Sequence, residues 1–244
     1  MNDHKFAFII CTNNQIYLNE CFYYLEQLFI PKGYETDILT IESAHSMTAG
    51  YNEGMKSTDA KYKIYMHQDV FITNRYFLSD ILSIFETDMS IGLIGMVGYP
   101  VVSRSGFMWH EKRMGAVPLY GGNHAYPHAD FLSYHYSLSD GIEDVALVDG
   151  LMMVTAYDLP WNDRDLKDWD FYDAFQSMNF LLHGYRVVVP NQKLPWFIHD
   201  DGKILSMWNY NKYRKLFMKT YAAYLNKSCF EIRNGAIRNE HSTL

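Results

Sequence analysis

The sequence has few cysteines and no long apolar segment. Cys11, Cys21 and Cys229 are its three cysteines, and their odd number without C-x-x-C spacing argues against a disulfide framework and a zinc knuckle. The longest uncharged apolar stretch, 89–103, contains three glycines and a proline and is shorter than the roughly 20 residues of a membrane-spanning helix. The apolar run at 6–11 lacks the length and cleavage site of a secretory signal. We therefore expect no transmembrane segment and a cytoplasmic location.

Charge of one sign is not concentrated anywhere in the chain. The 21 Lys and Arg residues against 28 Asp and Glu residues give a net charge of −7, so we expect no nucleic-acid partner. The phosphate loop G-x-x-x-x-G-K-[ST], the dinucleotide motif G-x-G-x-x-G and the esterase motif G-x-S-x-G are absent, which argues against kinases, dehydrogenases and esterases. A content of 48% hydrophobic and 16% aromatic residues in 244 residues suffices for the core of one large domain.

Apolar periodicity predicts alternating strands and helices. The expected elements are a strand at 6–11, a helix at 18–29 ended by Pro31 and Gly33, a strand at 36–41, a helix at 47–57 capped by Ser46, a strand at 62–66, a helix from Asn74 to 85, strands at 91–97 and 145–155, a helix at 172–183 ended by Gly184, a strand at 187–189 and a helix at 208–225. Such an order predicts an α/β fold with a mostly parallel sheet that binds ligands beyond the carboxyl ends of its strands.

The polar segment His67-Gln68-Asp69 follows the third predicted strand directly. A carboxylate with an imidazole two residues earlier offers oxygen and nitrogen ligands to a divalent cation, which in turn binds a diphosphate. Alternatively, Asp69 caps the next segment and His67 belongs to the core. Spacing alone does not decide between these two interpretations.

Four segments in order resemble the nucleotide-binding half of family 2-like glycosyltransferases with the GT-A fold. They are Thr12-Asn13-Asn14, Glu42, the Ala49–Gly54 segment with Asn52-Glu53-Gly54, and His67-Gln68-Asp69-Val70. Family members typically have Asn-x-Gly before the third strand and Asp-x-Asp at its end, and here His67 replaces the first aspartate. The resemblance implies nucleotide-sugar binding by Thr12, Asn14, Glu42, Asn52 and Gln68, with Glu42 against the base. It also implies a Mn²⁺ or Mg²⁺ ion held by Asp69 and His67.

The second half of the chain continues this resemblance. Asp149-Gly150 resembles the start of the family's acceptor-side strand, beside the donor sugar, and His199 lies where related enzymes supply a histidine to the metal. In the family an acidic pair opens a helix about eleven residues before its closing glycine, and the second acid is the catalytic base. Asp173 matches that acid, Tyr172 replaces the first, and Asp170 is an alternative one turn away. Without the resemblance, Asp173 is simply a carboxylate that complements the helix dipole.

The resemblance covers about residues 5–202 and implies a Rossmann-like, mostly parallel central sheet flanked by helices. We expect a GT-A-like domain at 1–202, with a nucleotide-binding half at about 1–100 and an acceptor half at about 101–202, and a C-terminal helical extension at 203–244. The implied function is transfer of a sugar from a nucleotide diphosphate sugar to a hydroxyl of a glycan or lipid-linked acceptor. Inversion, metal assistance and a role in polysaccharide biosynthesis are expected.

Other interpretations remain open. Loss of the first aspartate is also compatible with an inactive nucleotide- or sugar-binding module. The aromatic C-terminal helix, with basic residues between its rings, suits a scaffold or peripheral contact with a membrane, although covering the sheet is a simpler role. The long segment 103–144 carries His110, His124, His128 and His135, which we interpret as loop residues.

Overall fold

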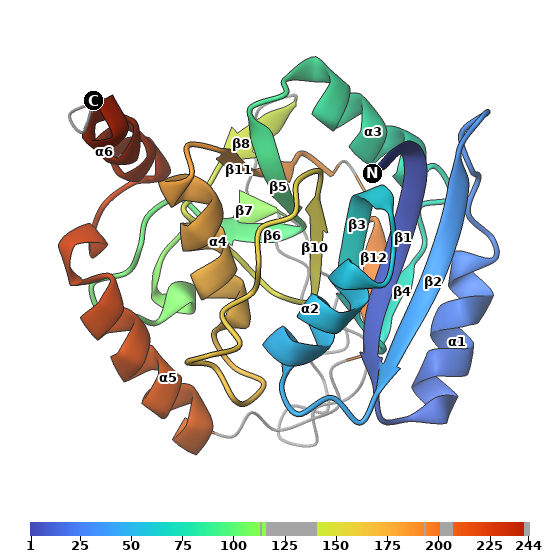
Figure 1. Cartoon of the computed structure of the whole chain (residues 1–244), viewed down its shortest axis with the longest axis horizontal. Helices are drawn as coiled ribbons and strands as arrows, with labels where there is room; N and C mark the ends of the chain where they lie inside the picture. The colour runs from blue at the N-terminus through green and yellow to red at the C-terminus, as the bar shows by residue number, and fades with distance from the viewer. Residues whose placement is uncertain (113, 116–140, 193, 201–206, 242–244) are drawn as a thin grey trace.

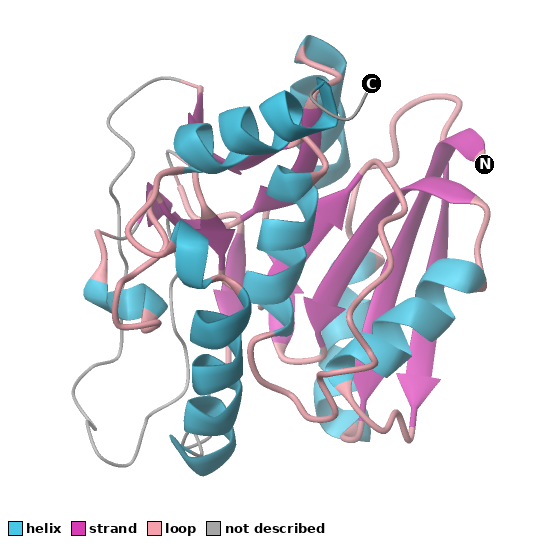
Figure 2. Ribbon diagram, turned by 60° about the vertical axis from the view of Figure 1, so that its left-hand side comes forward, coloured by secondary structure: helices cyan, strands magenta, loops and turns pink. Residues whose placement is uncertain are grey.

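The computed structural model describes residues 1–112, 114, 115, 141–192, 194–200 and 207–241. A seven-stranded sheet with helices on both faces forms its centre (Figure 1, Figure 2). The sheet contains β1 (Asn2–Thr12), β2 (Glu35–Glu42), β3 (Ala60–His67), β5 (Ile91–Gly95), β8 (Ile142–Asp144), β10 (Met152–Thr155) and β11 (Arg186–Pro190). Two smaller sheets contain β4 (Val70–Ile72) with β12 (Phe197–His199), and β6 (Val97–Tyr99) with β7 (Met114–Gly115) and β9 (Leu147–Val148). The helices are α1 (Gln15–Leu25), α2 (Met47–Lys56), α3 (Phe77–Thr87), α4 (Tyr172–Leu182), α5 (Met207–Thr220) and α6 (Cys229–His241), with short 3₁₀ turns η1 (Met108–His110) and η2 (Ala222–Tyr224).

The strand order of the large sheet is β2-β1-β3-β10-β5-β11-β8. β1 runs parallel to β2 and β3, and β11 runs parallel to β5, whereas β10 and β8 run antiparallel to their neighbours. Because β10 is antiparallel to both β3 and β5, β5 runs in the same direction as β3. The strands β1, β2, β3, β5 and β11 therefore share one direction. The expected mostly parallel sheet is confirmed.

Helices pack on both faces of this sheet because side chains of successive strand residues point to opposite faces. Ile9 and Cys11 of β1 lie in one core cluster with residues of α2 and α4, while Phe8 and Ile10 lie in a second cluster with residues of α1 and α3. All three cysteines are buried free thiols, and burial raises the pKa of the Cys11 thiol to about 12. They complete the core rather than supply chemistry.

Three helices differ from the predicted ones. α1 ends at Leu25, so Leu28 and Phe29 lie outside it, and the Phe29 amide donates to the carbonyl of Arg75. Asn74 does not cap α3, because this helix begins at Phe77. The Asn74 carboxamide instead donates to the Asp80 carboxylate. The predicted helix at 208–225 ends at Thr220, and α6 follows it.

The C-terminal helices contact the sheet domain. Tyr210, Tyr213 and Phe217 of α5 are buried in the same core cluster as α4, and the Tyr213 hydroxyl donates to the Asp168 carboxylate at 2.6 Å. Trp208 remains 84% exposed. The three buried side chains of α5 therefore pack into the core cluster that contains α4.

Among the described residues, no helix combines the length and apolar character that crossing a membrane requires. His124, His128 and His135 lie outside the described residues, as does the expected boundary at 202 and 203.

Candidate active site

His67, Asp69 and His199 meet at the carboxyl end of β3. β12 pairs antiparallel with β4 so that His199 lies opposite Val70, and the Asp200 amide donates to the Asp69 carbonyl at 2.9 Å. The Asp69 Oδ1 atom lies 3.5 Å from His199 Nε2 and 3.9 Å from His67 Nδ1. One ligand atom from each residue lies within 4.8 Å of the other two. The fold therefore brings together the three residues that the sequence predicts as metal ligands.

The Asp69 carboxylate is suited to a cation. Its Oδ1 atom is buried and accepts no hydrogen bond from the described part of the chain, a situation that is costly unless a further partner binds there. Burial acts to raise the pKa of Asp69, but the contact with His199 and the charges of both imidazoles outweigh burial and lower that pKa. An anionic oxygen facing two imidazole nitrogens fits a divalent transition metal.

Tyr172 holds His67 from the other side. The phenol, on the first residue of α4, is hydrogen-bonded to His67 Nε2, and its buried ring packs against Tyr51 and Trp161. A Cβ atom added to Gly150 would overlap the Tyr172 hydroxyl oxygen. The segment after β9 therefore requires glycine at this position if Tyr172 is to reach His67.

Asp173 is a buried carboxyl group in the first turn of α4. It is 8% exposed; its Oδ2 accepts from the Gly150 amide at 3.0 Å and its Oδ1 from the Ala174 amide at 2.7 Å. Burial, followed by the negative charge of Asp149, raises the pKa of Asp173 to about 7. A carboxyl group with such a pKa takes up and releases protons near neutral pH.

Asp170, the alternative base, lies outside α4. Phe171, with φ 65°, separates it from the first helical residue. Asp170 is half-buried, and burial followed by the charge of Asp168 raises its pKa above the ordinary value. Both candidate acids thus favour the neutral form more than a solvated aspartate does.

Gln68 organises the turn between β1 and α1. Its Oε1 accepts from the Thr12 hydroxyl and from the amides of Asn13 and Asn14, at 2.8 to 3.1 Å, and its Nε2 donates to Asn13 Oδ1 at 2.7 Å. Asn14 caps α1 by accepting from the Ile16 and Tyr17 amides. These contacts place the turn beside His67 and Asp69, and they occupy the Gln68 carboxamide.

Glu42 and Asn52 lie in different surroundings. Glu42 is exposed at the end of β2, opposite Thr12 in the strand register. Asn52 is buried in α2, where its carboxamide donates to the Trp161 carbonyl and Asp163 and accepts from the Trp161 amide. The strand ends therefore bring Glu42 and Thr12 together, whereas Asn52 fixes the 161–163 segment to α2.

Sequence reasoning missed two tyrosines near these groups. The charge of Asp200 is the main cause that raises the pKa of Tyr17, followed by burial and the charge of Asp69. Burial, followed by the charge of Asp173, raises the pKa of Tyr210 on α5. Neither tyrosine belongs to a sequence motif. The position of Tyr17 in the helix that follows the first strand is the one sequence feature that indicates a place near the site.

Three solved structures have similar folds. They are residues 1–349 of S. aureus TarS in complex with UDP (11% identity, TM-score 0.53, covering 80% of this chain and 60% of that one), the same TarS segment with UDP-GlcNAc (11%, 0.56, 98% and 73%), and the mannosyltransferase PcManGT from Pyrobaculum calidifontis with GDP-Man and Mn²⁺ (9%, 0.54, 97% and 69%). The chain thus spans 60% of the first of these structures. At such identities the similarity establishes the GT-A fold alone. No curated protein sequence gives a significant match.

The family model described as "Glycosyltransferase like family" matches residues 7–221. This match includes the carboxyl ends of β1, β2 and β3, the helix α4 and His199. It therefore includes every candidate site residue named above. The chain belongs to this glycosyltransferase-like family.

Proposed function

We propose that the chain transfers a sugar from a nucleotide diphosphate sugar to an acceptor hydroxyl, with inversion and with a divalent ion at His67, Asp69 and His199. One observation carries this proposal: a continuous set of contacts joins the metal-ligand cluster to a buried carboxyl group. The Tyr172 hydroxyl is hydrogen-bonded to His67 and lies against Gly150. The Gly150 amide in turn donates to the Asp173 carboxylate. These contacts support the proposal that the ligands of a diphosphate-bound ion and the proton acceptor belong to one site.

The ligand set favours Mn²⁺ over Mg²⁺. Mg²⁺ prefers oxygen ligands and keeps its waters, whereas two imidazoles with one carboxylate suit a transition metal. The solved structure of PcManGT, a protein of similar fold, is a complex with GDP-Man and Mn²⁺. A bound ion supplies positive charge that neutralises the leaving nucleotide diphosphate.

Asp173 is the proposed catalytic base. In direct displacement at the anomeric carbon the acceptor hydroxyl loses its proton as it attacks, and a carboxylate within hydrogen-bond reach accepts it. A pKa of about 7 allows Asp173 to be ionised at neutral pH and still to bind a proton firmly. Asp170 takes this role if the acceptor approaches from outside α4.

The β1–α1 turn and the end of β2 are proposed to bind the nucleotide. Thr12, Asn14 and Gln68 form the wall beside Asp69, and exposed Glu42 is available to the base. Asn52 acts as a positioning residue through the 161–163 segment. Asp149 and Gly150 lie beside the donor sugar. A glycan or lipid-linked acceptor in polysaccharide biosynthesis completes the proposal.

A turnover assay tests this function. The purified chain is incubated with UDP-GlcNAc or GDP-mannose, Mn²⁺ and a panel of oligosaccharide and polyprenyl-phosphate-linked acceptors, and released UDP or GDP and the product anomer are measured. We expect acceptor-dependent release that Asp173→Asn reduces at least about 100-fold, in line with loss of a general base, while nucleotide binding persists. Full activity of Asp173→Asn together with loss in Asp170→Asn assigns the base to Asp170. Nucleotide binding without turnover contradicts the transferase function.

A further inference from the structure

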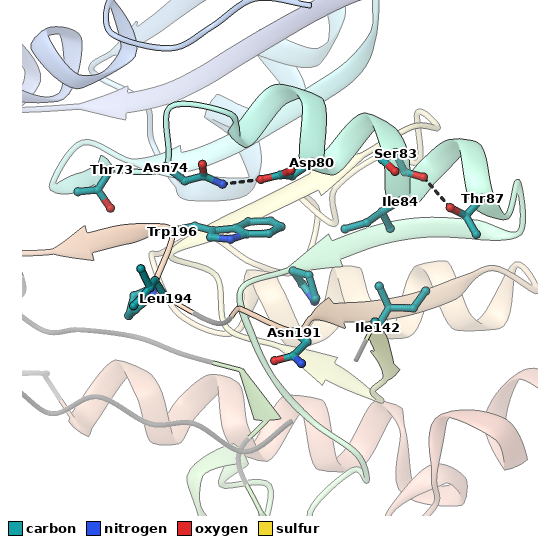
Figure 3. Close-up of a pocket in the computed structure, with 13 residues that line it drawn as sticks. Thr73, Asn74, Asp80, Ser83, Ile84, Thr87, Ile142, Asn191, Leu194 and Trp196 are labelled. Atoms are coloured by element: carbon teal, nitrogen blue, oxygen red, sulfur yellow. Dashed lines mark hydrogen bonds between the residues drawn. The ribbon is translucent and has the colours of Figure 1, made fainter. Parts of the chain in front are cut away.

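A cavity of about 780 Å³ lies away from the metal-ligand cluster, between α3 and the segment that connects β11 to β12. Thr73, Asn74, Asp80, Ser83, Asn191 and Trp196 are among the residues that line it. Figure 3 shows the Trp196 indole extending into the space between side chains of α3 and Asn191. The volume is within the range of about 300 to 1,000 Å³ typical of ligand sites.

The described lining combines the Trp196 indole and aliphatic side chains, such as those of Ile84, Ile142 and Leu194, with polar side chains. Asp80 is the one charged residue in the described lining, and its carboxylate accepts from the Asn74 carboxamide at 2.6 Å. Lysine and arginine do not occur among the described lining residues. Among the described lining residues, phosphates and nucleotides therefore meet the negative charge of Asp80 and no compensating positive charge, whereas hydroxyl groups find both acceptors and donors.

Trp196 is held in place by its neighbours. Its carbonyl accepts from the amides of Thr73 and Asn74, and its amide donates to Gln192 Oε1 at 3.1 Å. The Phe77 ring packs edge-on against the indole with centroids 6.0 Å apart. The indole is only partly buried. A fixed ring with accessible surface loses little conformational freedom when a ligand binds.

We propose that this cavity binds a neutral oligosaccharide, separately from the site at the end of β3. The polarised C–H groups on one face of a pyranose are attracted to the negative face of an indole, while the ring hydroxyls bond to Asp80 and Asn74. The β4–β12 ribbon connects the two places, with Asp69 at one end and Thr73 after the other. The four residue steps from Asp69 to Thr73 span at most about 13 Å of extended chain. The inference does not depend on the chain being a transferase.

Ser83 offers a test that leaves the site at the end of β3 unchanged. Ser83 is an exposed residue of α3 that lines the cavity, and Glu86 is an exposed residue of the same helix outside the described lining. Ser83→Tyr places a ring in the cavity, and Glu86→Tyr adds the same ring elsewhere. The probes are cello-, malto-, manno- and chitohexaose as neutral ligands, and hexagalacturonate as an acidic one. The readout is the indole N–H resonance of Trp196, assigned with Trp196→Phe.

We expect at least one neutral hexasaccharide to shift this resonance saturably. Ser83→Tyr weakens that binding at least tenfold, Glu86→Tyr leaves it within twofold, and UDP or GDP with Mn²⁺ does not compete. No saturable shift with any neutral probe, tighter binding of hexagalacturonate, or equal binding by Ser83→Tyr overturns the inference. Nucleotide binding, measured separately by thermal shift, reports on the proposed transferase site, so the failure of one proposal is distinguishable from that of the other.

Discussion

The Tyr172 hydroxyl is hydrogen-bonded to His67 Nε2, and the other imidazole nitrogen, Nδ1, faces Asp69. The two residues are 105 positions apart in the sequence. In the tautomer in which His67 donates its Nε2 proton to the phenol oxygen, the Nδ1 atom presents a lone pair on the side of Asp69. We therefore propose that Tyr172, which replaces an acid of the family pattern, positions His67 as a metal ligand.

Replacing Tyr172 by phenylalanine is expected to weaken metal binding. Loss of the hydroxyl releases His67, and removal of such an outer partner typically costs about 10- to 100-fold in metal affinity. Mn²⁺ affinity measured by calorimetry checks this. Tyr51→Phe is the matched control, because the Tyr51 hydroxyl is buried in the same aromatic cluster and has no hydrogen-bond partner among the described residues. Equal affinities of the two variants would show that the phenol does not position His67.

Replacing Gln68 by alanine is expected to destabilise the fold. The change leaves the Thr12 hydroxyl and two turn amides without their acceptor, and the loss of these bonds costs about 2 to 3 kcal/mol of unfolding free energy. Denaturant unfolding measures this loss. In Gln15→Ala one exposed side-chain bond to Asn19 is removed, so a change within about 0.5 kcal/mol is expected. A similarly small effect of Gln68→Ala would mean that solvent replaces the Gln68 contacts.

Gly150→Ala is expected to separate Tyr172 from His67. The new methyl group overlaps the Tyr172 hydroxyl, and overpacking of a buried site costs about 1 to 3 kcal/mol. Thermal unfolding and Mn²⁺ titration measure the two effects. Gly235→Ala in α6 meets no described atom within 4 Å, and it stabilises the helix by up to about 1 kcal/mol. Unchanged Mn²⁺ affinity and stability in Gly150→Ala contradict the tight approach of Tyr172.

Asp173 makes stability depend on pH in an unusual direction. Its folded-state pKa is raised to about 7, whereas an unfolded aspartate has a pKa near about 3.9. Between these values the folded chain holds a proton that the unfolded chain lacks. The contribution of Asp173 therefore decreases the free energy of unfolding as pH rises from about 4 to about 7, by up to about 1.4 kcal/mol per pH unit.

Denaturant unfolding over this pH range checks the assignment. Asp173→Asn lacks the titrating group, so its stability should decline less steeply with pH than that of the wild type. Asp165→Asn replaces an exposed aspartate whose pKa is lowered, chiefly by its hydrogen bond to Asn162, and it should not flatten the decline. Parallel pH profiles of the wild type and Asp173→Asn would mean that Asp173 does not hold its proton in the folded chain.

The elements that depend on local sequence were predictable. The apolar run at 6–11, the Ser46 cap and Gly184 after α4 each specify structure through neighbouring residues, and the corresponding strand, cap and helix end are present. α6 was missed although its signal is local. Ser228 and Glu231 form a capping box at its start, and Cys229, Ile232 and Ala236 follow at helical spacing and are buried.

The site was predictable only where the family pattern specifies it. The pairing of β12 with β4 brings His199 to Asp69, and no spacing within either segment indicates that pairing, since strand contacts across the chain depend on tertiary packing. The bond between Tyr172 and His67 has the same origin. The Asn52 carboxamide was predicted to bind the nucleotide. Its hydrogen bonds to the 161–163 segment depend on the path of a loop, which apolar periodicity does not predict.

Calorimetric titration of UDP and GDP into the wild-type chain, with and without Mn²⁺, tests the proposed metal-dependent nucleotide site most directly. His199→Ala and Asp69→Asn remove ligands of the cluster, and His183→Ala removes an exposed histidine at the end of α4. We predict that one nucleotide binds in a Mn²⁺-dependent manner to the wild type and to His183→Ala, and at least about tenfold more weakly to the other two, a difference of about 1.4 kcal/mol. Metal-independent binding, or equal affinity in all four proteins, would contradict the assignment of His67, Asp69 and His199 as the metal site.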